Sequence, residues 1–381
     1  MDRPGWLRER LRRERLDFML VSSPSNVAYL TGFRAVSYTR PVMLLVGRDT
    51  VLVLPALELE HARAVATACE LRPYGDEGLG GVGGRSPFDL ALDEVVAAAS
   101  RQGINRPGCR LGVEADAVTW EGYRRLAGAL RCELVPTRGL VEEARMVKDQ
   151  QELELIRSGC ALADHGMAVA VAATRVGVSE LELMAEGDRA MLLEAVRRFP
   201  GLVVSVGSRP VSGPKSALPH ALPGGRVLET GDVVLHGAGA VVEGYCCEVE
   251  RTVFLGQPRD ARMQEAFAAM ERAQWAGIQA IRPGVTCREV DRACRRALEE
   301  AGFGRFILHR SGHGMGLDVH EAPYLSESDE TVLSSGMVVS VEPGIYLPGV
   351  GGFRHSDTVL VTPAGAQCLT RYPRGLERLV R

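Results

Sequence analysis

The sequence predicts an α/β (α+β) protein of two domains, residues 1–145 and 146–381, and three observations support this prediction. The chain of 381 residues is long enough for two separate cores. Short apolar strands alternate with helices over the first part, which is typical of a mixed α/β sheet. After residues 145–148 the order is two helices followed by strands, and this order then repeats. The repetition indicates two related halves that pack their helices outside a curved sheet.

The first domain is expected to alternate between helices and strands along its length. Amphipathic spacing identifies the helices, and short apolar runs between turn residues identify the strands. The predicted helices are Trp6–Leu16, Leu57–Cys69, Pro87–Arg101 and Val118–Leu130, and the predicted strands are Phe18–Ser22, Pro41–Gly47, Val51–Leu54 and Arg110–Glu114. The segment SPSNVAYLTGF (23–33) predicts a turn-rich stretch that runs into an aromatic strand.

The second domain is expected to contain four long helices, over 148–174, Ser179–Arg198, Arg259–Ile281 and Cys287–Ala301. Two of them open with a capping box, in which a Ser or Thr is followed three residues later by Glu. The expected strands are Leu202–Val206, a hairpin over Gly231–Phe254, Met337–Val341 and Thr358–Val361. In the hairpin, the glycine-rich stretch that contains Gly237 and Gly239 is expected to turn the chain.

Bulk properties narrow the class of protein. The net charge is −3, which gives no general electrostatic case for a nucleic-acid partner or an anionic membrane. No apolar run reaches about 18 residues, so no membrane span is expected. The nine cysteines form no CxxC pair, and the N-terminus has no signal-peptide pattern. We therefore expect a reduced, cytoplasmic protein.

The hairpin carries two carboxylates that need a partner. Glu248 and Glu250 are two residues apart on the returning strand, so both side chains leave on the same face. Like charges this close make ionisation more costly, which a metal, a cationic ligand, an arginine or a proton would relieve. Arg251 is expected to point to the opposite face.

Other polar residues stand at the ends of buried apolar strands, beside glycines that permit close backbone approach. They are His220, His313, His320, Glu342, and the run Arg354, His355, Ser356 and Asp357. Taken singly, each is more often a surface or turn residue. Composition and spacing alone therefore predict only a polar site in an α/β protein.

Five segments resemble, in order, the pita-bread family of creatinase, prolidase, aminopeptidase P and methionine aminopeptidase. They are SGPKSALPH, the hairpin, GHGMGLDVHE, VEPGIY and GGFRHSDTVLVT. SPSNVAYLTGF is similar to the N-terminal domain of the creatinase and prolidase branch. The resemblance implies an N-terminal creatinase/prolidase-like mixed-sheet domain, followed by a catalytic pita-bread domain with a curved antiparallel sheet and outer helices.

The resemblance also implies that the metal site is remodelled. Metallopeptidases of this family hold two divalent ions with Asp, Asp, His, Glu and Glu. These positions fall here on Gly237, Glu248, His313, Glu342 and Ser356, so two ligands are missing and one is longer. A two-ion centre is not supported. Glu248, His313 and Glu342 remain as a possible site for one ion, which His236 would join only if the hairpin shifted register.

The preferred hypothesis follows the metal-free member, creatinase, which resembles this chain at Glu250. It is metal-independent hydrolysis of a C–N bond in a small cationic or zwitterionic amidine or amide, with no cofactor. The resemblance makes His220 the general acid/base, while Glu248, Glu250 and Glu342 would hold the cation. His313 and His320 would stabilise the oxyanion. Arg354 would bind a substrate carboxylate, with an ion pair to Asp357 or to the first domain as its alternative.

Two alternative hypotheses stay open. The first is an Xaa-Pro dipeptidase or aminopeptidase that uses one divalent ion (Zn, Mn, Co or Fe) at Glu248, His313 and Glu342. The second is a non-enzymatic peptide-binding module.

The resemblance also implies a homodimer in which a loop of the partner's N-terminal domain covers the site. Here that loop would be Arg34–Arg40, with Tyr38 and Arg40 reaching the substrate. The alternative is an ordinary surface loop.

Overall fold

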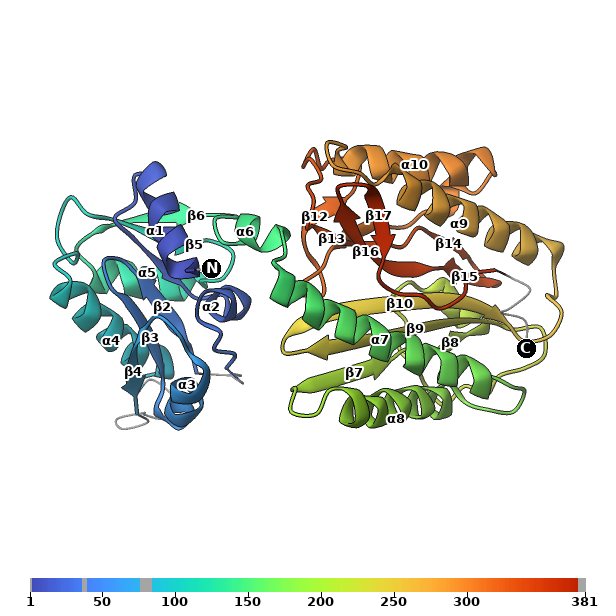
Figure 1. The fold of residues 1–381 in the computed structure, drawn as a ribbon, viewed down its shortest axis with the longest axis horizontal. Coiled ribbons are helices and arrows are strands. Elements are labelled where there is room, and N and C mark those ends of the chain that lie inside the picture. Colours follow the sequence, from blue (N-terminus) through green and yellow to red (C-terminus); the bar gives the residue numbers. More distant parts are fainter. Residues whose placement is uncertain (1, 36–39, 76–83, 376–381) are drawn as a thin grey trace. The chain divides into compact units, whose positions relative to one another are not determined.

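The computed structural model describes residues 2–35, 40–75 and 84–375. The chain divides into two compact units, Met1–Ala144 and Arg145–Arg381. Within the described residues, no helix is both long and apolar enough to cross a membrane. The two units are drawn in Figure 1 and are described separately below.

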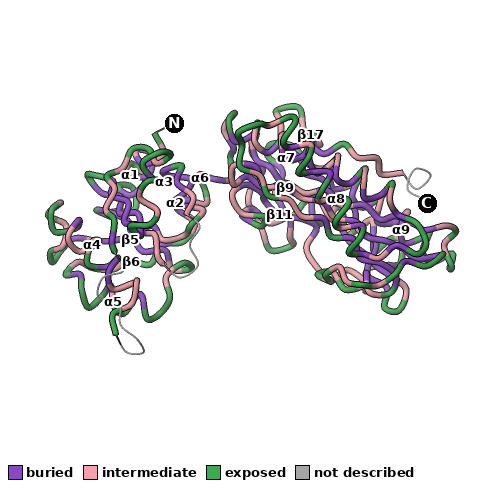
Figure 2. Tube along the Cα trace, turned by 90° about the horizontal axis from the view of Figure 1, so that it is seen from below, coloured by how far each residue is buried: buried purple, intermediate pink, exposed green. Residues whose placement is uncertain are grey.

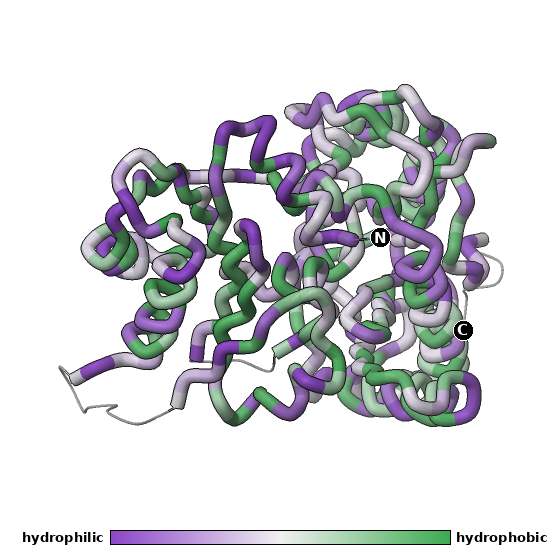
Figure 3. The backbone as a smooth tube through the Cα atoms, turned by 60° about the vertical axis from the view of Figure 1, so that its left-hand side comes forward, coloured by the Kyte–Doolittle hydropathy of each residue, from purple (hydrophilic) through white to green (hydrophobic). Residues whose placement is uncertain are grey.

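The N-terminal unit is built on a six-stranded mixed sheet in the order β4-β3-β2-β1-β5-β6. Its strands are β1 (Phe18–Val21), β2 (Met43–Val46), β3 (Thr50–Pro55), β4 (Glu70–Tyr74), β5 (Arg110–Glu114) and β6 (Glu133–Thr137). Its helices are α1 (Arg3–Arg13), α2 (Pro24–Thr31), α3 (Leu59–Val65), α4 (Pro87–Arg101) and α5 (Trp120–Ala129), and α6 (Glu142–Met146) crosses the boundary between the units. Strands β1, β2 and β3 are buried along their whole length. Figure 3 colours the chain by hydropathy, with hydrophobic stretches in green.

One predicted element of this unit is wrong. Residues 23–33 do not turn into a strand but form the helix α2. Pro24 stands in its first turn, where the missing N–H costs nothing, and Gly32 ends it with a left-handed φ of 78°. These two signals mark a short helix rather than a turn before a strand.

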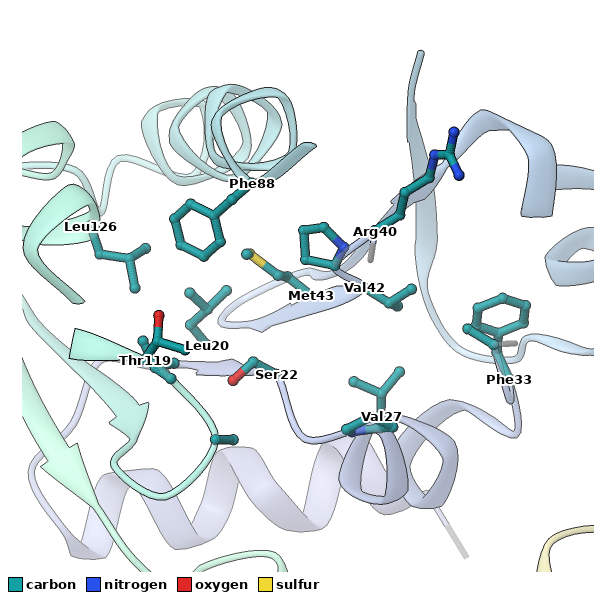
Figure 4. Close-up of a pocket in the computed structure, with 15 residues that line it drawn as sticks. Leu20, Ser22, Val27, Phe33, Arg40, Val42, Met43, Phe88, Thr119 and Leu126 are labelled. Atoms are coloured by element: carbon teal, nitrogen blue, oxygen red, sulfur yellow. The ribbon is translucent and has the colours of Figure 1, made fainter. Parts of the chain in front are cut away.

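The N-terminal unit also contains a pocket of about 240 Å³ (Figure 4). Leu20, Phe33, Met43 and Phe88 supply apolar walls, and Arg40 lies at its margin. Arg40 therefore lines a hollow of its own unit, and Tyr38 lies outside the described residues. The expected contribution of this loop to a partner's site stays a prediction.

The C-terminal unit is built on a nine-stranded antiparallel sheet whose main path runs β12-β11-β13-β16-β10-β9-β7. Strand β17 pairs with β16, β8 pairs with β9, and β14 and β15 form a separate pair. The strands are β7 (Val204–Ser208), β8 (Val211–Ser212), β9 (Val233–Val242), β10 (Tyr245–Phe254), β11 (Gly312–Gly314), β12 (Glu321–Leu325), β13 (Val338–Val341), β14 (Gly344–Leu347), β15 (Gly351–Arg354), β16 (Ser356–Thr362) and β17 (Gly365–Cys368).

Two helix pairs pack on this sheet, as the repeated order predicts (Figure 1). They are α7 (Gln150–Ala173) with α8 (Glu180–Arg198), and α9 (Ala261–Ala280) with α10 (Cys287–Glu300). Both expected capping boxes, Ser179 with Glu182 and Thr286 with Glu289, are present. Buried segments run through the inside of each unit in Figure 2. The fold class is confirmed, including the curved antiparallel sheet with outer helices.

The hairpin β9–β10 turns later than expected. Its turn is Glu243-Gly244, two residues with positive φ of 48° and 85°, which is the usual geometry of a two-residue hairpin loop. Gly237 and Gly239 remain inside β9, directly opposite Glu250 and Glu248. Because these glycines lack side chains, they leave room on the face where the two carboxylates stand.

Candidate active site

One group of side chains in the C-terminal unit has the spacing of a metal site. Glu248 comes from β10, His313 from β11, and Glu342 follows β13. Their ligand atoms all lie within 4.8 Å of one another. His313 Nε2 lies 3.3 Å from Glu342 Oε1 and 3.7 Å from Glu248 Oε1. Bonds of about 2.1 Å in a tetrahedral site place ligand atoms about 3.4 Å apart, so these side chains fit one divalent ion.

His313 is oriented as a metal ligand would be. Its Nδ1 lies 3.0 Å from the carbonyl oxygen of Gly314, so Nδ1–H donates to it and Nε2 is the ring nitrogen that faces the carboxylates. Nε2 is buried and makes no hydrogen bond within the described part of the chain. Buried polar atoms usually have a partner, and this one faces two carboxylates without bonding either.

The electrostatics of the group also favour a cation. Burial, and next the charge of Glu342, raise the pKa of Glu248 to about 7. Burial also opposes ionisation of Glu342, but its contact with His313 and the charges of His313 and Arg354 outweigh burial and lower its pKa to about 2. Burial lowers the pKa of His313, and the two carboxylates more than reverse this, so it is raised. A divalent ion would relieve the repulsion between the carboxylates.

The guanidinium group of Arg354 occupies the place where a cationic substrate group was expected to bind. Arg354 pairs with Glu250 in a two-pronged contact, with Nη2 2.6 Å from Oε1 and Nε against Oε2. Arg354 Nε also lies 3.9 Å from Glu342 Oε2. Burial lowers the pKa of Arg354, but the charge of Glu250 more than offsets this and raises it well above the usual value. Glu250 and Glu342 are thus supplied with a cation by the chain itself.

This contact corrects two expectations. Glu250 does not offer an open site for a substrate cation, because Arg354 already satisfies it. Arg354 neither pairs with Asp357 nor stands free for a substrate carboxylate. Asp357 is instead bound by Arg251 at 2.9 Å and by Arg374 at 2.8 Å, on the opposite face of the hairpin, as expected for Arg251.

The two remaining metal-ligand positions of the family, 237 and 356, carry no carboxylate in this chain. Ser356 Oγ donates to Glu248 Oε1 at 2.9 Å, so it orients the candidate ligand Glu248. At Gly237 an added Cβ would lie 3.4 Å from Glu250 Oε1. Since Gly237 and Glu250 face each other in the register of β9 and β10, the Glu250 carboxylate occupies space next to the missing ligand.

The shared space gives a first testable prediction. Gly237→Asp alone is expected to lower the melting temperature, because it places a second carboxylate directly across from Glu250. In a Glu250→Thr background the same change is expected to cost less, since the introduced carboxylate then becomes the acidic partner of Arg354. Thermal melting of the two single variants and the double variant measures the coupling, and strictly additive shifts would contradict the shared space.

His220 and His320 both line a cavity of about 840 Å³ that also contains Glu248, Glu250 and Glu342. The His320 ring stands edge-on to the His313 ring, with centroids 4.0 Å apart. Burial, and then the charge of His313, lower the pKa of His320 to about 4. Arg354 lines this cavity too, so the structure brings six of the predicted residues to one cavity, with His313 beside them.

Tyr346 and His309, which lie beside Arg354, were not named in the sequence analysis. Tyr346 accepts from Arg354 Nη1 at 2.6 Å, and its hydroxyl lies 2.7 Å from His309 Nε2. His309 Nδ1–H donates to the carbonyl of Arg310 at 2.6 Å, so the Tyr346 hydroxyl donates to Nε2. Tyr346 belongs to the recognised VEPGIY segment, and His309 shortly precedes GHGMG. Their proximity to the recognised motifs was the available signal.

The other two histidines near the motifs point elsewhere. His236 is buried, and its Nε2 lies 3.0 Å from Thr174 Oγ1, on the face away from Glu248. His355 is fully buried against Phe267, with ring centroids 5.2 Å apart. Neither joins the group formed by Glu248, His313 and Glu342.

Comparison with known proteins matches both parts of the chain. The model of metallopeptidase family M24 matches residues 154–363, and the creatinase/prolidase N-terminal domain matches residues 4–147. The chain belongs to metallopeptidase family M24. This M24 protein is therefore a hydrolase of C–N bonds with the pita-bread fold that the sequence motifs predicted.

Relatives of this M24 protein include peptidases along its whole length. A putative dipeptidase, YkvY of Bacillus subtilis strain 168, is 32% identical over 93% of this chain and 94% of its own. A solved Xaa-Pro dipeptidase from Bacillus anthracis is 31% identical with a TM-score of 0.87, covering 100% and 99% of the two chains. A solved prolidase from Pyrococcus horikoshii OT3 is 27% identical with a TM-score of 0.84, covering 99% and 100%.

These findings change the order of the functional hypotheses. They support a peptidase and give no support to metal-independent hydrolysis of an amidine, which the sequence analysis preferred. They also fail to support the expectation of no cofactor, because the family uses metals and a fitting ligand group is present. The placement of Arg354 gives the physical reason, since it satisfies the carboxylates that a cationic substrate was expected to meet.

Proposed function

We propose that the protein is an Xaa-Pro dipeptidase that works with one divalent ion held by Glu248, His313 and Glu342. The observation that carries this proposal is the buried Nε2 of His313, which faces two carboxylates at ligand spacing without a hydrogen bond. The peptidase relatives supply the substrate class. Arg354 supplies a fixed positive charge beside the ion, in a region where family members hold a second one.

A bound ion would polarise the scissile carbonyl and lower the pKa of a bound water. The chain's own residues orient and move protons around that position. His320, whose pKa is lowered to about 4, is a neutral imidazole at neutral pH and can accept a hydrogen bond beside His313. His220, on the wall of the same cavity, is proposed as the group that returns a proton to the leaving nitrogen.

The contacts of Arg354 fix the positions of Arg354 and Glu250 in the wall of the cavity. Its two bonds to Glu250 and its bond to Tyr346 fix the guanidinium through all three of its nitrogens. The same bonds keep Glu250 from acting as a free ligand or base. Glu250 is therefore proposed as a positioning residue for Arg354 and not as a substrate ligand.

Metal analysis tests the proposed function directly. The purified protein is expected to contain one tightly held divalent ion per chain, and to hydrolyse alanyl-proline until a chelator removes that ion. Elemental analysis gives the stoichiometry, and re-addition of Zn²⁺, Mn²⁺, Co²⁺ or Fe²⁺ identifies the active ion. Hydrolysis that survives complete removal of the metal would overturn the proposal in favour of metal-independent chemistry. Two ions per chain would overturn the single-ion site.

A further inference from the structure

The charges around the site cavity do not balance, and the imbalance points to an anionic substrate group. Glu250 is paired with Arg354, while Glu248 and Glu342 are, with His313, the proposed ligands of the ion. Two other arginines, Arg209 and Arg310, line the same cavity of about 840 Å³. Among the described residues, neither of these two side chains has an acidic partner.

Of the two arginines, Arg310 is the one held in place. Its guanidinium carbon lies 4.3 Å from the centroid of the Tyr324 ring, a cation–π contact that fixes the plane of the group. Its carbonyl accepts the 2.6 Å hydrogen bond from His309. The side chain is half-buried. An arginine fixed in this way loses less conformational entropy when it binds a carboxylate, which favours specific recognition.

Arg310 also stands close to the proposed ion. It lies three residues before His313, and Tyr324, on which it stacks, is directly opposite His313 in the register of β11 and β12. Arg310 and His320 also line the same cavity. Arg209, in contrast, is exposed, and its backbone alone is bonded, to Gly237.

We propose that Arg310 binds the C-terminal carboxylate of the substrate and thereby selects dipeptides with a free carboxyl end. This inference rests on the proposed dipeptidase function. In a dipeptide the carboxylate lies one residue beyond the scissile bond, so a planar cation near the ion can pair with it through two N–H groups. The role expected from sequence for Arg354 thus moves to Arg310, because Arg354 is neutralised by Glu250.

Hydrolysis of alanyl-proline and of its C-terminal amide by four proteins tests the inference. The wild-type enzyme is expected to have a KM for the acid about tenfold or more below that for the amide. Arg310→Gln is expected to raise the KM for the acid about tenfold or more with a smaller change in kcat, and to remove the discrimination against the amide. Arg310→Lys is expected to restore part of it. Arg209→Gln, which removes the same charge from the same cavity, is the matched control and is expected to keep the discrimination.

The outcomes separate the inference from the function on which it rests. A structural role for Arg310 would impair acid and amide alike, so an unchanged acid-to-amide ratio in Arg310→Gln overturns the inference while the dipeptidase function stands. Loss of discrimination in Arg209→Gln alone would assign the carboxylate to Arg209 and also overturn it. Failure of the wild-type enzyme to hydrolyse either peptide would overturn the dipeptidase proposal itself. Calorimetric binding of the two peptides and a melting curve for each variant check affinity and folding without turnover.

Discussion

Replacement of His313 by glutamine is expected to leave the purified protein without its metal ion and to reduce hydrolysis of alanyl-proline by about a thousandfold or more. The reason is geometric. His313 supplies the only neutral nitrogen of the proposed ligand group, and its Nε2 lies between Glu248 and Glu342. Without it, two buried carboxylates remain, and their repulsion favours protonation over ion binding. Elemental analysis measures the lost ion independently of activity.

The matched control for this variant is His236→Gln. His236 is also buried, but it lies on the other face of the hairpin and bonds Thr174, a contact that glutamine can keep. We expect this variant to retain one ion and nearly full activity. An ion retained by His313→Gln, or lost from His236→Gln, would show that the ligand group is wrongly assigned.

The second large effect is expected from the pair Arg354 and Glu250. Arg354→Gln is expected to lower the free energy of unfolding by about 3 kcal/mol, because it leaves the largely buried Glu250 without its cation. Glu250→Gln is expected to have a similar effect through the unpaired guanidinium. The double variant should lose much less than the sum, since a neutral pair carries no uncompensated charge. Chemical denaturation of the four proteins gives the coupling energy.

A chemical rescue sharpens this test. Arg354→Ala removes the guanidinium and leaves its place between Glu250 and Tyr346 open. Added methylguanidine is expected to raise the melting temperature of Arg354→Ala, and to leave the double variant Arg354→Ala, Glu250→Gln unaffected. A coupling energy near zero, or an equal response of both variants, would mean that the contact contributes little to stability.

The sequence was most informative where local pattern decides the structure. Helical periodicity and capping boxes located the long helices of the second unit within a few residues of their bounds. Period-two spacing placed Glu248 and Glu250 on one face. Sequence periodicity was less informative where one or two residues determine the local structure. An example is α2, a short helix that begins at Pro24 and is terminated by Gly32. Periodicity also misplaced the hairpin turn, which positive φ at Glu243 and Gly244 defines.

The sequence predicted which residues form the site, but not which of their side chains contact each other. The family resemblance named Glu248, His313 and Glu342, and the structure brings them together. The partner of Arg354 depends on how β15 approaches β10, which no local pattern reports. That one contact decides whether Glu250 faces substrate or protein, and it separates the two leading hypotheses. For the same reason, no local pattern distinguishes Arg310, whose lack of an acidic partner among the described residues depends on the tertiary structure.

The facing positions Gly237 and Glu250 have a consequence for the history of the protein. Because a side chain at position 237 would lie against the Glu250 carboxylate, the effect of a residue at either position depends on the residue at the other. Sequences with a carboxylate at both positions are expected to be rare, because the two charges repel. Sequences with a carboxylate at neither position are expected to leave Arg354 without an acidic partner. Descent from a two-metal ancestor would therefore favour a linked exchange across the hairpin, and M24 sequences with a glutamate at the second of these positions should rarely keep an aspartate at the first.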